Sequence, residues 1–182
     1  MSPLVLLLLA CTGGDKTSQD TTEGPDPDPA TVPGLRLAAD AWARLDGDDD
    51  PYRVEGDDEV ECSPLGWKSE SGFFEIESDY CAKATWAQPL LGDVAAGDTL
   101  EFVFWHLDLW ADPPYRATLE MAIEGEAIWH YEVDVPSSEN VLQVEVLVPV
   151  SVAEGATATL HLDNHGVNSW RVGEVSLVAA EP

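Results

Sequence analysis

Basic residues are scarce in this sequence of 182 residues. Only 8 Lys and Arg stand against 35 Asp and Glu, so the formal net charge is −27. Binding of nucleic acid depends on cationic side chains that neutralise phosphates, and anionic lipid headgroups require the same complementarity. The composition therefore excludes nucleic acid as a partner.

Motifs that carry catalysis are also missing. The chain has no Gly-x-Ser-x-Gly elbow, no Walker loop, no dinucleotide fingerprint and no zinc-protease helix. Carboxylate pairs do not discriminate in so acidic a chain. We therefore expect a protein that is not an enzyme.

Long apolar runs are absent, and the longest one near the start covers residues 4–10. A membrane-spanning helix needs about 20 such residues, so 1–10 is predicted to be a signal peptide. The segment Leu8-Leu9-Ala10-Cys11 resembles the bacterial lipobox. The resemblance implies cleavage before Cys11 and attachment of acyl chains such as palmitate to it. Several chains anchor a protein firmly because each buried CH₂ contributes about 0.8 kcal/mol.

Residues 11–34 are polar and rich in Thr, Asp, Gly and Pro. Because they cannot bury apolar area, we expect a disordered acidic tether that carries the lipid. In lipobox proteins an Asp after the cysteine favours the inner membrane. Thr12 takes that position here, so the resemblance favours the outer membrane of a bacterial envelope.

Cysteine is also rare, with three in the chain. If Cys11 carries lipid, Cys62 and Cys81 remain as an even pair in an oxidising compartment. We expect a disulfide between them, with free buried thiols as the alternative. No second cysteine pair or close histidine supports zinc.

What the chain does contain is strand-like alternation. In 115–123 every second residue from Ala117 to Ile123 is apolar, and the residues between, including Glu120, are mostly polar. Short turns rich in Gly, Pro, Asp and Ser separate such stretches. This pattern predicts one all-β domain over 35–182, an antiparallel β-sandwich of the jelly-roll type. Further strands are expected at 72–77, 80–86, 99–107, 127–135, 141–148, 156–162 and 169–178.

Two segments need separate comment. Residues 35–45 fit one helical face and a leading strand equally well. The closing stretch 160–170, followed by Val172, Val175 and Leu177, resembles the end of galactose-binding-like and carbohydrate-binding jelly rolls. That resemblance implies that the strand bearing Trp170 packs across the sandwich.

Three histidines are candidates for a metal site. His106 ends one predicted strand, and His161 and His165 bracket a turn, so the three could meet at one end of the sandwich and bind copper or zinc. The alternative is that they hydrogen-bond backbone and loops.

An acidic loop is a candidate for calcium. Asp46, Asp48, Asp50 and Asp57 occupy positions one, three, five and twelve of a calcium loop, but Pro51 stands where that loop needs glycine. A solvated acidic loop is the alternative.

Aromatic side chains near strand ends are candidates for glycan binding, because flat rings stack on pyranose faces. Trp105, Trp110, Trp129 and Tyr131 are the candidates, and Trp110 is the one most expected to be exposed. Core packing is the alternative, since aromatic rings bury large areas.

Three functions remain open at this point. The first is a non-enzymatic binding module on a lipid anchor, for a glycan or an envelope protein. The second is a metal protein that uses the three histidines. The third is a purely structural envelope lipoprotein.

Overall fold

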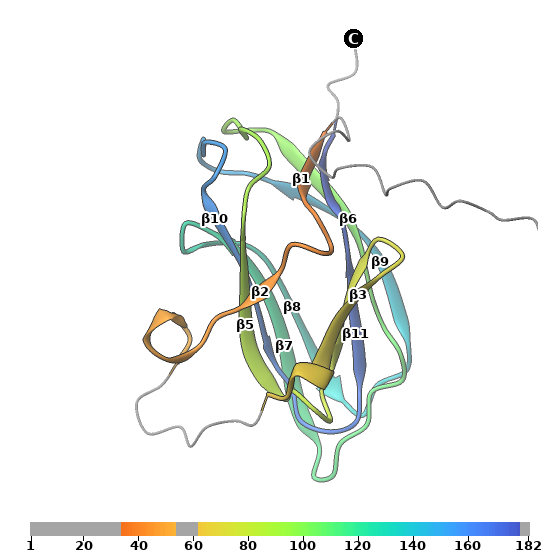
Figure 1. The fold of residues 1–182 in the computed structure, drawn as a ribbon. Helices are drawn as coiled ribbons and strands as arrows, with labels where there is room; N and C mark the ends of the chain where they lie inside the picture. The colour runs from red at the N-terminus through yellow and green to blue at the C-terminus, as the bar shows by residue number, and fades with distance from the viewer. Residues whose placement is uncertain (1–33, 54–61, 179–182) are drawn as a thin grey trace, which may run out of the picture.

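The computed structural model describes residues 34–53 and 62–178, which form strands and two short 3₁₀ turns (Figure 1). Within these two ranges no helix has the length and apolar character needed to cross a membrane. Residues 1–33, which include the predicted signal peptide, Cys11 and nearly all of the predicted tether, lie outside the described residues, as does Asp57.

The first sheet, called sheet A, is antiparallel and has seven strands. Its order is β1-β12-β6-β11-β4-β3, and β9 pairs with β6. Both β11 and β12 pair with β6 at different points along its length, so a broken final strand lies beside one continuous strand. The strands are β1 (Leu35–Leu37), β3 (Trp67–Glu70), β4 (Phe73–Glu77), β6 (Thr99–His106), β9 (Asn140–Leu147), β11 (Ser169–Gly173) and β12 (Val175–Leu177).

The second sheet, called sheet B, is antiparallel and has the order β2-β5-β10-β7-β8. The chain crosses from one sheet to the other repeatedly between β4 and β11, as in a jelly roll. The expected antiparallel β-sandwich is confirmed. The strands are β2 (Ala43–Arg44), β5 (Lys83–Pro89), β7 (Tyr115–Ile123), β8 (Glu126–Val135) and β10 (Thr157–Asp163).

The core lies between the sheets and follows the period of two that strands impose. On β6, every second residue from Leu100 to His106 is buried, and on β7 the same holds from Ala117 to Ile123. Trp170 on β11 is fully buried, and its ring lies 6.4 Å from the ring of Tyr131 on β8 of sheet B, measured between centroids. The expected packing of a tryptophan-bearing final strand across the sandwich is therefore confirmed.

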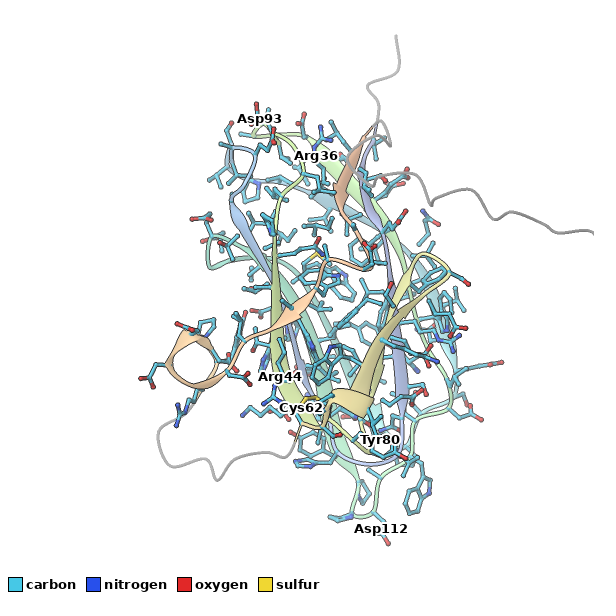
Figure 2. The ribbon with its side chains drawn as sticks, in the orientation of Figure 1. Arg36, Arg44, Cys62, Tyr80, Asp93 and Asp112 are labelled. Atoms are coloured by element: carbon cyan, nitrogen blue, oxygen red, sulfur yellow. A yellow bond between two sulfur atoms is a disulfide. The ribbon has the colours of Figure 1, made fainter. Side chains whose placement is uncertain are left out.

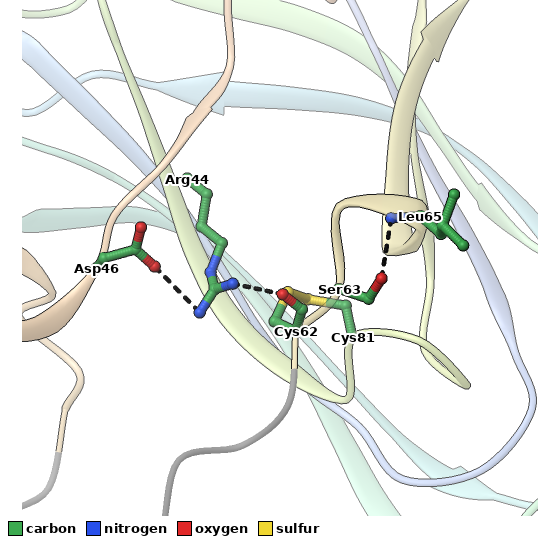
Figure 3. The surroundings of a disulfide bond; sticks show 6 residues. All are labelled: Arg44, Asp46, Cys62, Ser63, Leu65 and Cys81. Atoms are coloured by element: carbon green, nitrogen blue, oxygen red, sulfur yellow. Dashed lines mark hydrogen bonds and ion pairs between the residues drawn. A yellow bond between two sulfur atoms is a disulfide. The ribbon is translucent and has the colours of Figure 1, made fainter.

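The disulfide between Cys62 and Cys81 is present, as expected (Figure 3). The two cysteines also form an isolated antiparallel bridge. Ser63 caps the short turn η3 (Pro64–Gly66) by accepting a hydrogen bond from the Leu65 amide. The Arg44 guanidinium donates to the Cys62 carbonyl, so this hydrogen bond connects the disulfide to the edge strand β2.

Most expected strands lie within a few residues of their predicted positions, and two segments differ. Residues 35–45 contain no helix: they form β1 and β2, separated by a turn in which the Gln88 side chain bonds the backbone of Ala38. Strand β3 was not expected. It has a single apolar side chain, Trp67, because it forms an edge of sheet A.

Candidate functional site

A pocket of about 540 Å³ opens on the outer face of sheet B, the face turned away from sheet A. Ligand pockets in proteins commonly measure about 300–1,000 Å³, so this volume suits a small molecule. The pocket is lined by Leu45, Asp49, Pro51, Tyr52, Glu120, Glu124, Gly125, Thr157 and Thr159.

The hollow exists because one row of outward side chains is short. Thr159 on β10 pairs with Ala87 on β5 and with Ala122 on β7. The next row contains His161 and Glu120, which are much longer. A depression therefore lies beside a ridge on the same sheet surface.

One wall of the pocket is the segment 46–53, which leaves the edge strand β2 and crosses the outer face of sheet B. It begins with the short turn η2 (Gly47–Asp49). The fully buried Thr85 hydroxyl donates to Asp50 Oδ1 at 2.6 Å, and the Tyr52 amide donates to the same oxygen at 2.9 Å. Asp50 thus fastens this segment to the sheet.

His161 completes the fastening. Because the Thr85 hydroxyl already donates to Asp50, it accepts from His161 Nδ1, which lies 2.8 Å away. Burial lowers the pKa of His161 despite nearby carboxylates, so the ring is neutral with its proton on Nδ1. The orientation of the imidazole is fixed by this bond.

Tyr52 stands on that imidazole. The two rings are 4.0 Å apart between centroids and inclined by only 8°. The Tyr52 hydroxyl donates to Glu120 Oε1. Burial, followed by this carboxylate, raises the pKa of Tyr52, so the hydroxyl stays protonated. A flat aromatic ring is thereby held rigidly in the pocket wall.

The polar groups of the pocket are mainly oxygen acceptors. Glu120 is partly exposed, and its second oxygen lies 3.4 Å from His130 Nδ1. Glu124 and Asp49 are exposed at the rim. Glu124 also accepts from the Thr157 amide at 2.6 Å, which fixes its position. The pocket therefore combines a rigid ring, hydroxyls and carboxylates in a strongly negative field.

The three candidate histidines do not meet. His106 is buried between the sheets, where Nδ1 donates to the Leu107 carbonyl and Nε2 accepts from the Tyr131 hydroxyl. His161 lies under Tyr52, and His165 is exposed and packs edge-on against Tyr115. In the described residues no three His, Cys, Asp or Glu side chains gather as a metal would require. The predicted copper or zinc site does not form, because each ring satisfies a different part of the fold.

The three described aspartates of the proposed calcium loop diverge as well. Asp46 pairs with Arg44 at 3.1 Å, Asp48 pairs with Arg53 at 3.2 Å, and Asp50 bonds Thr85. Their carboxylates therefore serve three different partners instead of one cation.

The four aromatic candidates lie in three separate places. Trp105 is on the outer face of sheet A, where Arg171 lies 5.2 Å from its ring. Trp129 and Tyr131 face inward from the edge strand β8 and pack against Phe104. Trp110 lies in the loop after β6 and is 60% exposed. Its expected exposure is confirmed, but the four rings do not form one platform.

The residues that build the pocket were not candidates from the sequence. The alternation of β7 did place Glu120 on the outer face. Tyr52, however, follows the acidic stretch 46–50, where the sequence has no alternation of apolar and polar residues. Its contacts with Glu120 and His161 join distant parts of the chain, which local patterns do not reveal.

No family model matches the chain, and no curated protein matches it. Among solved structures, one described as "CBM4 structure and function" aligns with a TM-score of 0.37 and 12% identity, over 62% of this chain and 75% of the other. The N-terminal cellulose-binding domain of a Cellulomonas fimi β-1,4-glucanase aligns with a TM-score of 0.41 and 8% identity, over 67% and 93%. The Agl-KA catalytic domain gives a TM-score of 0.43 and 12% identity, covering 84% of this chain but 28% of that one. Similarity this low carries no information on ligand or activity.

Proposed function

We propose that this protein is a non-enzymatic binding module for neutral or amino-bearing saccharides, held at a bacterial envelope by the lipid on Cys11. The observation that carries the proposal is the pocket on sheet B with the Tyr52 ring fixed in its wall. The outer membrane remains the expected cellular location.

Sugar recognition needs an apolar surface and directed hydrogen bonds together. An aromatic face covers the C–H side of a pyranose, while polar side chains bond the hydroxyls around its rim. Tyr52 supplies the ring, Thr159 and Thr157 stand at the floor and edge, and Glu120 faces the same space. Carboxylates are strong acceptors for hydroxyl donors, because a charged acceptor strengthens the bond.

The charge of the site selects among saccharides. Asp49, Glu120 and Glu124 all line the pocket, and the whole chain carries −27. Uronic acids and sulfated sugars would therefore be repelled, whereas neutral sugars and amino sugars would not. This selectivity separates the proposal from nonspecific adhesion.

The pocket also weighs against the two alternatives. A purely structural lipoprotein has no need of a hollow with a fixed aromatic wall. A metal protein would need converging ligands, and the described part of the chain brings no such group together.

Titration calorimetry of the folded domain with neutral, amino and uronic oligosaccharides tests the binding. Tyr52→Ala and Glu120→Gln should weaken binding at least tenfold, because each removes a central contact. Tyr80→Ala and Glu145→Gln change the same residue types at exposed positions outside the pocket, so these variants should bind the saccharides with unchanged affinity. Binding that survives Tyr52→Ala, or no heat with any neutral or amino oligosaccharide, would overturn the proposal.

The anchor is tested separately in cells. Mass spectrometry of the mature protein should find a chain that begins at an acylated Cys11, and Cys11→Ser should release the protein from membranes. An intact leader or an unmodified sulfur would refute the lipid anchor without affecting the pocket.

A further inference from the structure

One end of the sandwich exposes a group of apolar side chains on four neighbouring loops. The group, called the apolar loop end, consists of Leu65, Tyr80, Leu107, Trp110 and Val167, which are 45–74% exposed. Figure 2 shows Tyr80 and Asp112 at this end, far from Arg36 and Asp93 at the opposite end. A contiguous apolar surface that stays exposed on a monomeric protein commonly marks a binding site.

These four loops are joined by hydrogen bonds between them. The Ser78 hydroxyl donates to the Gly166 carbonyl at 2.7 Å, which joins the loop before Tyr80 to the loop of Val167. The Ser63 amide donates to the Tyr80 carbonyl at 2.9 Å, and this adds the Leu65 turn. The disulfide reinforces the same junction (Figure 3).

The buried Asn168 side chain secures the loop that carries Trp110. Asn168 Oδ1 accepts from the Trp110 amide at 2.5 Å, while Nδ2 donates to Asn164 Oδ1 and to the His165 carbonyl. At Gly166 a Cβ would lie 2.0 Å from the Trp110 carbonyl oxygen, so the two backbones touch there. The exposed side chains therefore stand on a preorganised base, which lowers the entropic cost of binding a partner.

We propose that the apolar loop end docks a second protein through a surface with apolar side chains surrounded by Lys and Arg. The exposed carboxylates of Asp79, Asp108 and Asp112 lie in the same loops as the apolar residues. A basic rim on the partner complements them, and Trp and Tyr, both present in the apolar loop end, are typical anchors of protein interfaces. A second copy of this chain would bring two acidic rims together, and an anionic lipid surface would meet the same repulsion.

A synthetic amphipathic helix of leucine and lysine serves as the probe, and the same helix with glutamate in place of lysine is its control. Trp110→Ala should weaken binding of the lysine peptide at least tenfold, as loss of a central aromatic anchor does. Val141→Ala removes an equally exposed apolar side chain from the outer face of sheet A and should change affinity less than twofold. The affinity should fall as salt rises, and the glutamate peptide should not bind.

Melting temperatures establish that the variants fold, and Tyr80→Ala provides a second change in the apolar loop end. Equal affinity of the wild type, Trp110→Ala and Tyr80→Ala would overturn the proposal, since charge alone would then explain binding. Insertion of Trp110 into phosphatidylcholine vesicles would also overturn it, as would a dimer that Trp110→Ala dissociates. Tyr52→Ala should leave peptide binding intact, so the docking proposal and the saccharide proposal can be refuted independently of each other.

Discussion

Replacing Thr85 by valine should detach the wall segment 46–53 from sheet B. The Thr85 side chain is fully buried, and its hydroxyl hydrogen-bonds both Asp50 and the His161 imidazole. Valine has nearly the same shape but cannot donate or accept. The substitution therefore removes two hydrogen bonds without opening a cavity.

The expected loss follows from what each partner does afterwards. A neutral bond contributes about 1 kcal/mol and a bond to a charged group about 1.5–3 kcal/mol. Asp50 is only half-buried and can hydrogen-bond water instead, so the loss of its bond to Thr85 should cost an amount at the low end of that range. His161 Nδ1 stays buried with its donor unsatisfied. We expect the free energy of unfolding to fall by about 2–4 kcal/mol, which lowers the melting temperature by about 10 °C.

Urea denaturation measures the loss, and Thr118→Val is the matched control. Thr118 lies on the same outer face of sheet B, and its hydroxyl makes no hydrogen bond within the described residues, so that change should cost less than about 0.5 kcal/mol. Thr85→Val should also weaken saccharide binding, because Tyr52 would lose its fixed position. Equal stability of the two variants would refute the fastening role assigned to Thr85.

Three further predictions concern single features of the fold. Burial lowers the pKa of His161, so as the pH falls below about 6.5 the imidazole is protonated in the unfolded chain but not in the folded one. Through this group the free energy of unfolding of the wild type should fall by up to about 1.4 kcal/mol per pH unit. The variant His161→Gln should lack this contribution when urea denaturation is measured at several pH values. Gly166→Ala should destabilise the protein by more than about 2 kcal/mol, because φ is +102° and the new Cβ meets a carbonyl oxygen; Gly125→Ala, with φ of +78° and open space, should cost about 1 kcal/mol in the same melt. Reduction or Cys62→Ala with Cys81→Ala should cost about 3 kcal/mol by the chain-entropy account, since the bridge spans 19 residues; an unchanged denaturation midpoint would contradict it.

The fold could be predicted because alternation survives wherever one face of a strand is buried and the other is wet. Strand β7 was expected at 115–123 and lies at Tyr115–Ile123. Residues 35–45 were ambiguous because their apolar spacing of three to four suits a helix. In the structure the buried Gln88 amide bonds Ala38 and holds a turn there, and no local pattern encodes a partner 50 residues away.

The site could be predicted far less well, for a reason visible in β10. Its outward residues Thr159 and His161 are polar, so the sequence places them in water, yet both are buried. The segment 46–53 covers His161 and Thr85, and this cover comes from a part of the chain that has no apolar period. Polar groups lose their water only where other polar groups replace it, here Asp50 and the Tyr52 hydroxyl beside Glu120. Buried polar side chains on the outer face of a sheet thus indicate that a distant segment of the chain packs there. In this protein the packing of segment 46–53 closes one side of the pocket. Without that segment, Thr159 and Glu120 would line only an open groove.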